Sequence, residues 1–172
     1  MTSHRAAAER ELRAETLIAA PPEAVWRVLE AVRTWPRRSP ELAAMLPLKP
    51  GGLRPGQWYV GVNRRRAVLW PTRNVITEVT PGRCLSWDTT TSGVRWIFEL
   101  ETTPGGTRLV HRRPVTGRLT LVGRVFARFA LGGETSHAAE LEHGMSQTLA
   151  AIKREAEVPD RKTAPAPTGL RP

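Results

Sequence analysis

His111 and Arg113 are the two residues of this sequence best suited to acid–base chemistry. They lie two positions apart in a stretch, 107–116, whose alternation predicts a strand, so their side chains share one face. A histidine has an ordinary pKa of about 6.5 and can transfer a proton near neutral pH. Because a neighbouring guanidinium repels the protonated imidazole, we expect His111 to be neutral and basic. Arg113 would then stabilise an enolate or a carboxylate.

Two further residues could assist this pair, and a simpler interpretation competes with it. Tyr59 and Asn74 are predicted to project from nearby strands and could donate a hydrogen bond to a reacting oxygen. The simpler interpretation is that His111, Arg112 and Arg113 form one solvated basic patch near a strand end. The residues alone leave both interpretations open.

No metal or cofactor site is predicted. The four histidines at 4, 111, 137 and 143 lack the spacing of metal ligands. Cys84 follows a Pro-Gly-Arg turn, where Arg83 could lower the pKa of the thiol, but no general base is evident nearby. A small buried strand residue is the simpler interpretation of Cys84. The glycine pairs that begin at 51, 105 and 132 lack the lysine or helix context of a phosphate-binding loop.

The elements that must position these residues begin with a strand and two short helices. Alternating hydrophobicity predicts a strand over 12–20, which the following prolines end because proline cannot donate a ladder hydrogen bond. Val25, Val28 and Leu29 then recur at helical spacing and predict a short helix. A second helical turn is expected to stop at Pro36.

A series of strands is predicted to follow the helices. Pro-Gly or Gly-Gly pairs separate most of the segments, and the arginines at 64–66 are placed at a hairpin tip. Turn signals at intervals of about ten residues favour an antiparallel meander. The predicted strands are 42–48, 57–63, 67–79, 84–90, 94–103 and 107–116.

After Gly117 the apolar residues recur every three or four positions, which predicts helix. The period is present over 119–129 and again over 141–152. Gly132 and Gly133 interrupt it, and glycine is unfavourable inside a helix. Either two helices or one sharply bent helix is therefore expected to lie across the sheet.

Six motifs occur in a characteristic order along this chain. They are IAAPPEAVWRVL (18–29), WPRRSPEL (35–42), PGQWYVGVNRR (55–65), TEVTPGRCLSW (77–87), WIFELETTPGGTRL (96–109) and HGMSQTLAAIKREAE (143–157). Their order resembles that of the START-like (SRPBCC) superfamily, of the polyketide cyclase/dehydrase and lipid-transport type. The resemblance implies an α+β helix-grip (START/Bet v 1-like) fold. In that fold a curved antiparallel sheet of six to seven strands surrounds a central cavity, with two short helices after the first strand and a long C-terminal helix above.

The resemblance also implies a function and has one departure. In such a protein His111, Arg113 and Tyr59 could close a ring by aldol chemistry and dehydrate the product of a polyketide-like substrate. Relatives often place a second aromatic residue three positions after the tryptophan of the WP turn, where this sequence has Arg38. The way in which this end of the cavity closes is therefore left open.

A cavity between sheet and helix is the expected binding site, because a strongly curved sheet cannot bring all its inner side chains into contact with one helix. Trp26 and Trp35 are predicted to pack at the helix end and Trp58 to lie on the outer face; core packing is the simpler interpretation of the other tryptophans. Strand parity and helical spacing predict an aromatic lining with a few polar groups, suited to a flat, oxygenated ligand. The predicted lining is Trp70, Thr72, Asn74, Trp87, Trp96, Phe98, Leu109, Phe126 and Met145.

Length and composition predict one ligand-binding domain over 10–157, with a flexible tail over 1–9 and a disordered, proline-rich tail over 158–172. The single cysteine cannot form an intramolecular disulfide, and no segment has the roughly 20 apolar residues of a membrane span. The N-terminus has no apolar run typical of a signal peptide, so a cytoplasmic protein is expected. All but three of the 26 basic residues are arginine, and the net charge is +10.

Three classes of function remain open. The first is a cyclase or dehydratase, and the second is a carrier or sensor of a lipid or other apolar molecule. In both, the expected partner is an apolar or aromatic small molecule. The third class is a basic protein that docks on an anionic membrane or nucleic acid through Arg118, Arg124 and Arg128, beside an apolar stripe over 121–129. No known nucleic-acid motif is present, so nucleic acid is not an expected partner, and the oligomeric state is left open.

Overall fold

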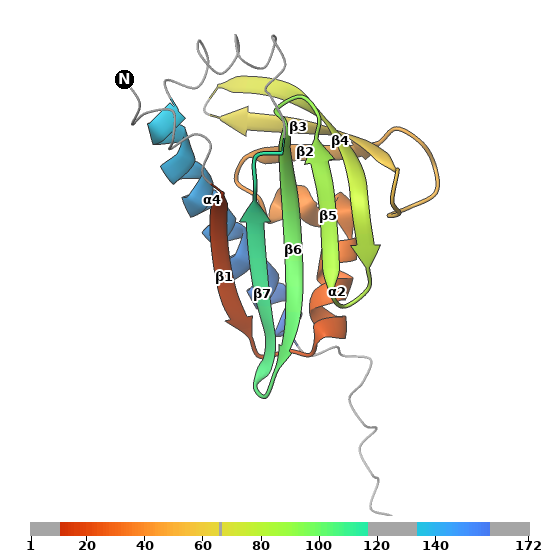
Figure 1. The fold of residues 1–172 in the computed structure, drawn as a ribbon, viewed down its shortest axis with the longest axis vertical. Coiled ribbons are helices and arrows are strands. Elements are labelled where there is room, and N and C mark those ends of the chain that lie inside the picture. The colour runs from red at the N-terminus through yellow and green to blue at the C-terminus, as the bar shows by residue number, and fades with distance from the viewer. Residues whose placement is uncertain (1–10, 66, 117–133, 159–172) are drawn as a thin grey trace, which may run out of the picture.

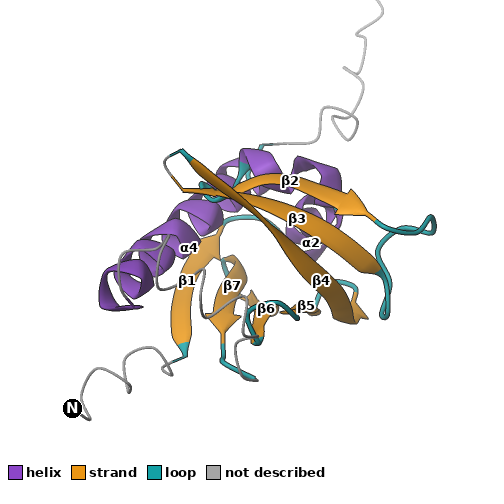
Figure 2. Cartoon of the chain, turned by 90° about the horizontal axis from the view of Figure 1, so that it is seen from above, coloured by secondary structure: helices purple, strands orange, loops and turns teal. Residues whose placement is uncertain are grey.

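The computed structural model describes residues 11–65, 67–116 and 134–158, which form a curved antiparallel sheet with helices on its concave side (Figure 1). The order of the strands in the sheet is β1-β7-β6-β5-β4-β3-β2, so β1 and β2 are its edges. Figure 2 shows β2, β3 and β4 turning steeply away from β5, β6 and β7. The predicted helix-grip fold is confirmed. The strands are β1 (Leu12–Ile18), β2 (Leu42–Pro47), β3 (Trp58–Arg65), β4 (Val68–Thr80), β5 (Cys84–Thr89), β6 (Val94–Thr103) and β7 (Gly106–Arg113).

Two short helices follow β1, as the sequence predicts: α2 (Pro22–Glu30) and the 3-10 helix η1 (Val32–Arg37). Proline is tolerated at the start of α2 because the first N–H groups of a helix have no partner within it. The predicted end of the second turn is wrong by one residue, since η1 continues through Pro36 to Arg37. A proline near the end of a short 3-10 turn removes only one hydrogen bond, and its fixed φ suits the turn.

The long strand β4 contains a proline, which a central strand would not tolerate. β4 pairs with β3 from Val68 onward, but its pairing with β5 begins only at Asn74 opposite Thr89. Pro71 therefore lies where one side of β4 has no neighbouring strand in the ladder. This half of β4 belongs to the part of the sheet that turns away in Figure 2.

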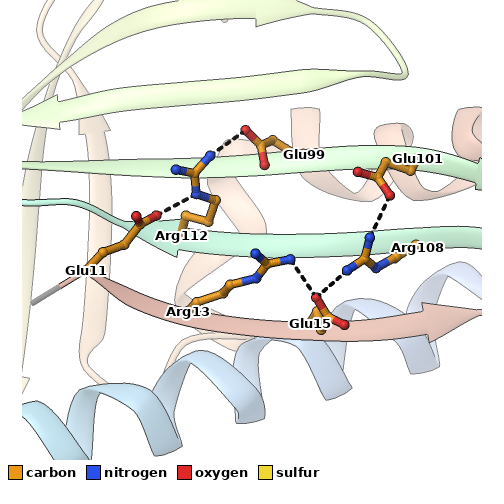
Figure 3. A network of polar contacts seen from close by, with 7 residues as sticks. All are labelled: Glu11, Arg13, Glu15, Glu99, Glu101, Arg108 and Arg112. Carbon is orange, nitrogen blue, oxygen red and sulfur yellow. Dashed lines mark hydrogen bonds and ion pairs between the residues drawn. The ribbon is translucent and has the colours of Figure 1, made fainter.

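The outer face of the sheet carries a network of ion pairs across β1, β7 and β6 (Figure 3). Arg108 bonds Glu15 on β1 at 2.7 Å and Glu101 on β6 at 2.8 Å. Four residues further along β7, Arg112 bonds Glu11, which precedes β1, and Glu99 on β6. Each exposed pair contributes little stability, but together they satisfy the guanidinium groups of β7 on this face.

The helix α4 (Glu134–Ala156) crosses the concave side and is anchored by an ion pair whose arginine is buried. Arg38, whose side chain is only 4% exposed, donates two hydrogen bonds to the carboxylate of Glu155, at 2.6 and 2.7 Å. Its third nitrogen donates to the carbonyl of Val28 on α2, at 2.7 Å. Arg38 thus joins α2 to α4.

Several predictions fall on residues outside the described part of the chain. They concern the helical stretch over 119–129 with Phe126, the break at Gly132–Gly133, and the basic residues Arg118, Arg124 and Arg128. The predicted tails also lie outside it, apart from Val158. Within the described residues, no helix is both long and apolar enough to cross a membrane.

We expect Glu155→Ala to lower the free energy of unfolding by about 1–3 kcal/mol, because it removes the carboxylate from a buried guanidinium. The loss should stay below that of a fully buried pair, since Glu155 itself is half exposed. Urea denaturation measures it. The matched control is Arg154→Ala on the same turn, which should change stability by less than about 0.5 kcal/mol. Equal effects of the two substitutions would contradict the anchoring role of Arg38.

Candidate functional site

A cavity of about 210 Å³ lies between the inner face of the sheet and α4. Its walls come from the end of α2, from η1 and the loop after it, from the strands β2 to β7, and from one face of α4. Nine of the twelve predicted site residues line it. They are Trp70, Thr72, Asn74, Trp87, Trp96, Phe98, His111, Arg113 and Met145.

His111 is buried, with 4% of its surface exposed, and its ring stacks on Phe98 at 4.1 Å between centroids. Trp96 lies 5.4 Å away on the same strand as Phe98. Neither ring nitrogen of His111 has a hydrogen-bond partner within the described residues. A buried polar atom without a partner is costly, so both nitrogens carry a desolvation cost that no hydrogen bond within the described residues offsets.

The acid–base properties of His111 differ from the prediction. Burial lowers the pKa of His111 to about 3, so the imidazole is neutral, as expected. The cause is desolvation and not repulsion by Arg113. A base with so low a pKa binds a proton weakly, so the expected basic character is wrong for the protein without ligand.

The interpretation of His111, Arg112 and Arg113 as one solvated patch is also wrong. Alternation along β7 turns Arg112 to the outer face, where it joins the ion pairs of Figure 3. His111 and Arg113 point inward and line the cavity. Successive strand residues face opposite sides, so the three side chains cannot form one surface.

Arg113 brings a partly buried positive charge to the cavity. Its guanidinium lies 5.4 Å from the ring centre of Trp96, and its Nε has no hydrogen-bond partner within the described residues. Burial lowers the pKa of Arg113, and the carboxylate of Glu41 opposes that shift. Glu41, which the sequence analysis missed, also lines the cavity. Burial raises the pKa of the Glu41 carboxyl, although Arg65 and Arg113 counteract this.

A ladder of polar side chains lines the wall formed by β3, β4 and β5. Asn63 donates to the hydroxyl of Thr72 at 2.9 Å, and Thr89 donates to the amide oxygen of Asn74 at 2.7 Å. The amide nitrogen of Asn74 lies 3.3 Å from the same Thr72 hydroxyl. These groups already satisfy one another, so Asn74 is engaged and less free to donate to a ligand than predicted.

Two predicted site residues are not brought into the cavity lining, and a third is not among the described residues. Tyr59 and Leu109 point inward but pack in the hydrophobic core, at 4% and 0% exposure. Burial raises the pKa of Tyr59, which keeps its hydroxyl protonated. The third, Phe126, lies outside the described residues. Tyr59 is therefore no longer a candidate for contact with a substrate in this cavity.

The aromatic wall includes a tryptophan that was predicted only to pack. Trp35 on η1 lines the cavity, 4.8 Å from Trp87 between ring centres, and Trp87 stacks on Trp96 at 6.3 Å. The indole of Trp35 donates to the carbonyl of Leu29 at 2.7 Å, which fixes its orientation. Trp58, by contrast, lies on the outer face beneath Arg73.

Metal and thiol chemistry find no support among the described residues. They contain no cluster of three metal-ligating side chains. The pKa of Cys84 is raised to about 12 by burial and by the nearby Glu78 carboxylate, so its thiolate is not formed near neutral pH.

A curved seven-stranded sheet, a helix across it and a cavity between them define a helix-grip protein of the ligand-binding type. The chain belongs to the family described as polyketide cyclase/dehydrase and lipid transport, whose model matches residues 9–157. A comparison with curated proteins found no match.

Solved structures share this fold at low sequence identity. The di-domain ARO/CYC StfQ from the steffimycin biosynthetic pathway is 16% identical, with a TM-score of 0.65 over 86% of this chain and 50% of StfQ. The di-domain ARO/CYC BexL from the BE-7585A pathway is 19% identical, with a TM-score of 0.63 over 88% of this chain and 51% of BexL. Protein NE0264 from Nitrosomonas europaea is 19% identical, with a TM-score of 0.60 over 86% of this chain and 94% of NE0264. The chain thus spans about half the length of the two di-domain proteins, and identities this low show the fold alone.

Gly61→Ala should disturb the polar ladder. A Cβ at this position would lie 2.8 Å from the hydroxyl of Thr72 and 2.9 Å from the amide nitrogen of Asn74, both too close. We expect a loss of about 1–3 kcal/mol in the free energy of unfolding, measured by urea denaturation. Gly105→Ala is the control, because a Cβ there meets nothing within 4 Å. A loss confined to Gly61→Ala supports the role of the ladder, and equal effects would refute it.

The low pKa of His111 predicts a pH-dependent stability. The imidazole of His111 binds a proton more tightly in the unfolded chain than in the folded protein. The folded protein therefore loses stability as the pH falls from about 6.5 toward 3. Between pH 7 and pH 5 the wild type should lose about 2 kcal/mol more than His111→Phe. The raised pKa of Glu41 favours the folded state as the pH falls, but Glu41 is present in both proteins, so its contribution cancels in the comparison. Denaturation at both pH values tests this, with the exposed His143→Gln as control; identical pH dependence in wild type and His111→Phe would contradict it.

Proposed function

We propose that this protein binds a flat, mostly apolar small molecule that carries an oxygen substituent, in the cavity between the sheet and α4. The main support is His111, whose two buried ring nitrogens have no partner within the described residues. In the protein without ligand this is an unfavourable state, which a ligand hydroxyl or carbonyl would relieve. A neutral imidazole can donate to one oxygen and accept from another, so it suits a hydroxyl or a phenol.

The other walls agree with a ring-shaped ligand. One wall is aromatic, since the ring of Trp87 contacts those of Trp35 and Trp96. The ring of Phe98 stacks on the imidazole of His111. Aromatic faces bind flat rings with a preferred geometry and large buried area. A dry cavity of about 150 Å³ can hold a benzene molecule. At about 210 Å³, this one suits one or two fused rings better than an extended acyl chain.

Catalysis of ring closure is the second candidate, and Arg113 is the observation that favours it. Its partly buried guanidinium lines the same cavity as His111, and its Nε has no partner within the described residues, so it could stabilise an enolate. The family description names polyketide cyclases and dehydrases. We place binding first, because His111 with a pKa of about 3 is a poor acceptor of a proton from a substrate. Lipid carriage, and a cytoplasmic location, remain predictions from the sequence.

Isothermal titration calorimetry with 2-naphthol and naphthalene tests the proposal. His111→Phe keeps a ring stacked on Phe98 but removes both nitrogens. We expect it to weaken 2-naphthol binding about three- to tenfold, the effect of one lost hydrogen bond, and to leave naphthalene binding unchanged or stronger. Trp58→Phe on the outer face is the matched control and should affect neither compound.

Two results would count against cavity binding through His111. One is the absence of heat with either compound, and the other is equal loss of both compounds in His111→Phe. Loss of water from an added β-polyketone, seen by mass spectrometry in the wild type and abolished in Arg113→Gln, would favour the catalytic candidate instead.

A further inference from the structure

A second hollow lies outside the cavity, on the surface between η1, β2, β3 and α4. It is a groove of about 620 Å³ that shares Arg38, Ser39, Pro40 and Leu42 with the cavity wall. Three further arginines line it, each from a different element: Arg37 from η1, Arg64 from β3 and Arg154 from α4. Much of the remaining lining is small, with Ala43, Ala150 and Ala151, so the groove stays open between the arginines.

The arginines of this groove differ from most others in the described part of the chain. The other arginines on the sheet bond carboxylates, as Arg95 does with Asp88, or lie over a tryptophan ring, as Arg73 does with Trp58. Five exposed arginines have side chains with no hydrogen bond, ion pair or ring contact within the described residues, and three of the five line this one groove. The five are Arg33, Arg37, Arg64, Arg83 and Arg154.

Among the described residues that line the groove, Arg38 is the only charged one whose side chain has a partner, the carboxylate of Glu155. None of these lining residues is a carboxylate. Three guanidinium groups without a counter-ion therefore face one space and reinforce each other's field there. Guanidinium groups bind phosphate oxygens in a planar, two-bond geometry that lysine cannot match.

We infer that this groove is a binding site for a phosphate-type anion, held by Arg37, Arg64 and Arg154. The site is separate from the cavity, although the two share a wall, and it does not depend on the proposed ligand. The phosphate could belong to a free phosphorylated molecule or to a lipid headgroup, because both present the same oxygens. A tightly bound anion would link α4 to η1 and β3 through its three arginine contacts.

Calorimetric titration of the full chain with inorganic pyrophosphate at low salt tests this site. We expect saturable binding that Arg37→Gln with Arg154→Gln weakens about tenfold or more. Arg33→Gln with Arg83→Gln removes the same charge from exposed arginines outside the groove, and should change affinity less than about twofold. Arg64→Gln alone is the second groove variant, should the double substitution fail to fold.

The source of the phosphate is tested with vesicles of phosphatidic acid in phosphatidylcholine, against phosphatidylcholine alone. Vesicle binding that the groove variants abolish assigns a lipid headgroup; pyrophosphate binding without vesicle binding assigns a free phosphorylated molecule. Equal weakening by the groove and control variants would show a diffuse effect of net charge and overturn the site, as would the absence of binding to both probes. Unchanged 2-naphthol binding in the groove variants separates this result from the cavity proposal.

Discussion

The register of β7 is the constraint on which the site depends. β7 pairs with β6 on one side and β1 on the other, which places His111 opposite Phe98 and Ala14. A slip of one residue would turn His111 to solvent and bury arginines that now hold ion pairs on the outer face. The ion pairs of Arg108 and Arg112 with both neighbouring strands oppose such a slip (Figure 3). Pairs that contribute little to stability individually therefore help to specify which side chains enter the cavity.

The second constraint is the way α4 is held over the sheet. The buried guanidinium of Arg38 bonds Val28 on α2 and Glu155 on α4, with one hydrogen bond from each of its three nitrogens. Close approach of the helix is helped by Gly144, where a Cβ would lie 3.3 Å from the ring of Pro40. The same segment, from Arg38 to Leu42, forms a wall of both the cavity and the groove. A change in its position would thus alter the two hollows together.

Sequence patterns predicted the fold well because most strands have a two-residue period and most turns between them contain proline or glycine. They predicted the face of the sheet to which a side chain points, but not whether its position along the strand lies at the cavity or in the packed core. Tyr59 and Leu109 show this, since both point inward yet lie in the core beyond the cavity. Trp35 and Glu41 were missed because they come from η1 and the loop after it, where strand parity does not apply. Nor does a one-dimensional pattern reveal that His111 lacks partners, which depends on residues distant in sequence.

The cavity contains polar groups that are hydrogen-bonded within the protein and polar groups that are not. This difference affects the free energy of binding that a ligand would gain from each. The ladder of Asn63, Thr72 and Asn74 is satisfied within the protein, so a ligand that competes for it must first break existing bonds. Within the described part of the chain, both ring nitrogens of His111 and the Nε of Arg113 have no hydrogen-bond partner, so a ligand that bonds them breaks no bond seen there. Because the desolvation of these two side chains is already present in the folded protein, a hydrogen bond from a ligand adds to binding without that cost. Orientation in the cavity should therefore be set from the β7 side, with the oxygen of the ligand toward His111 and its ring against the tryptophans.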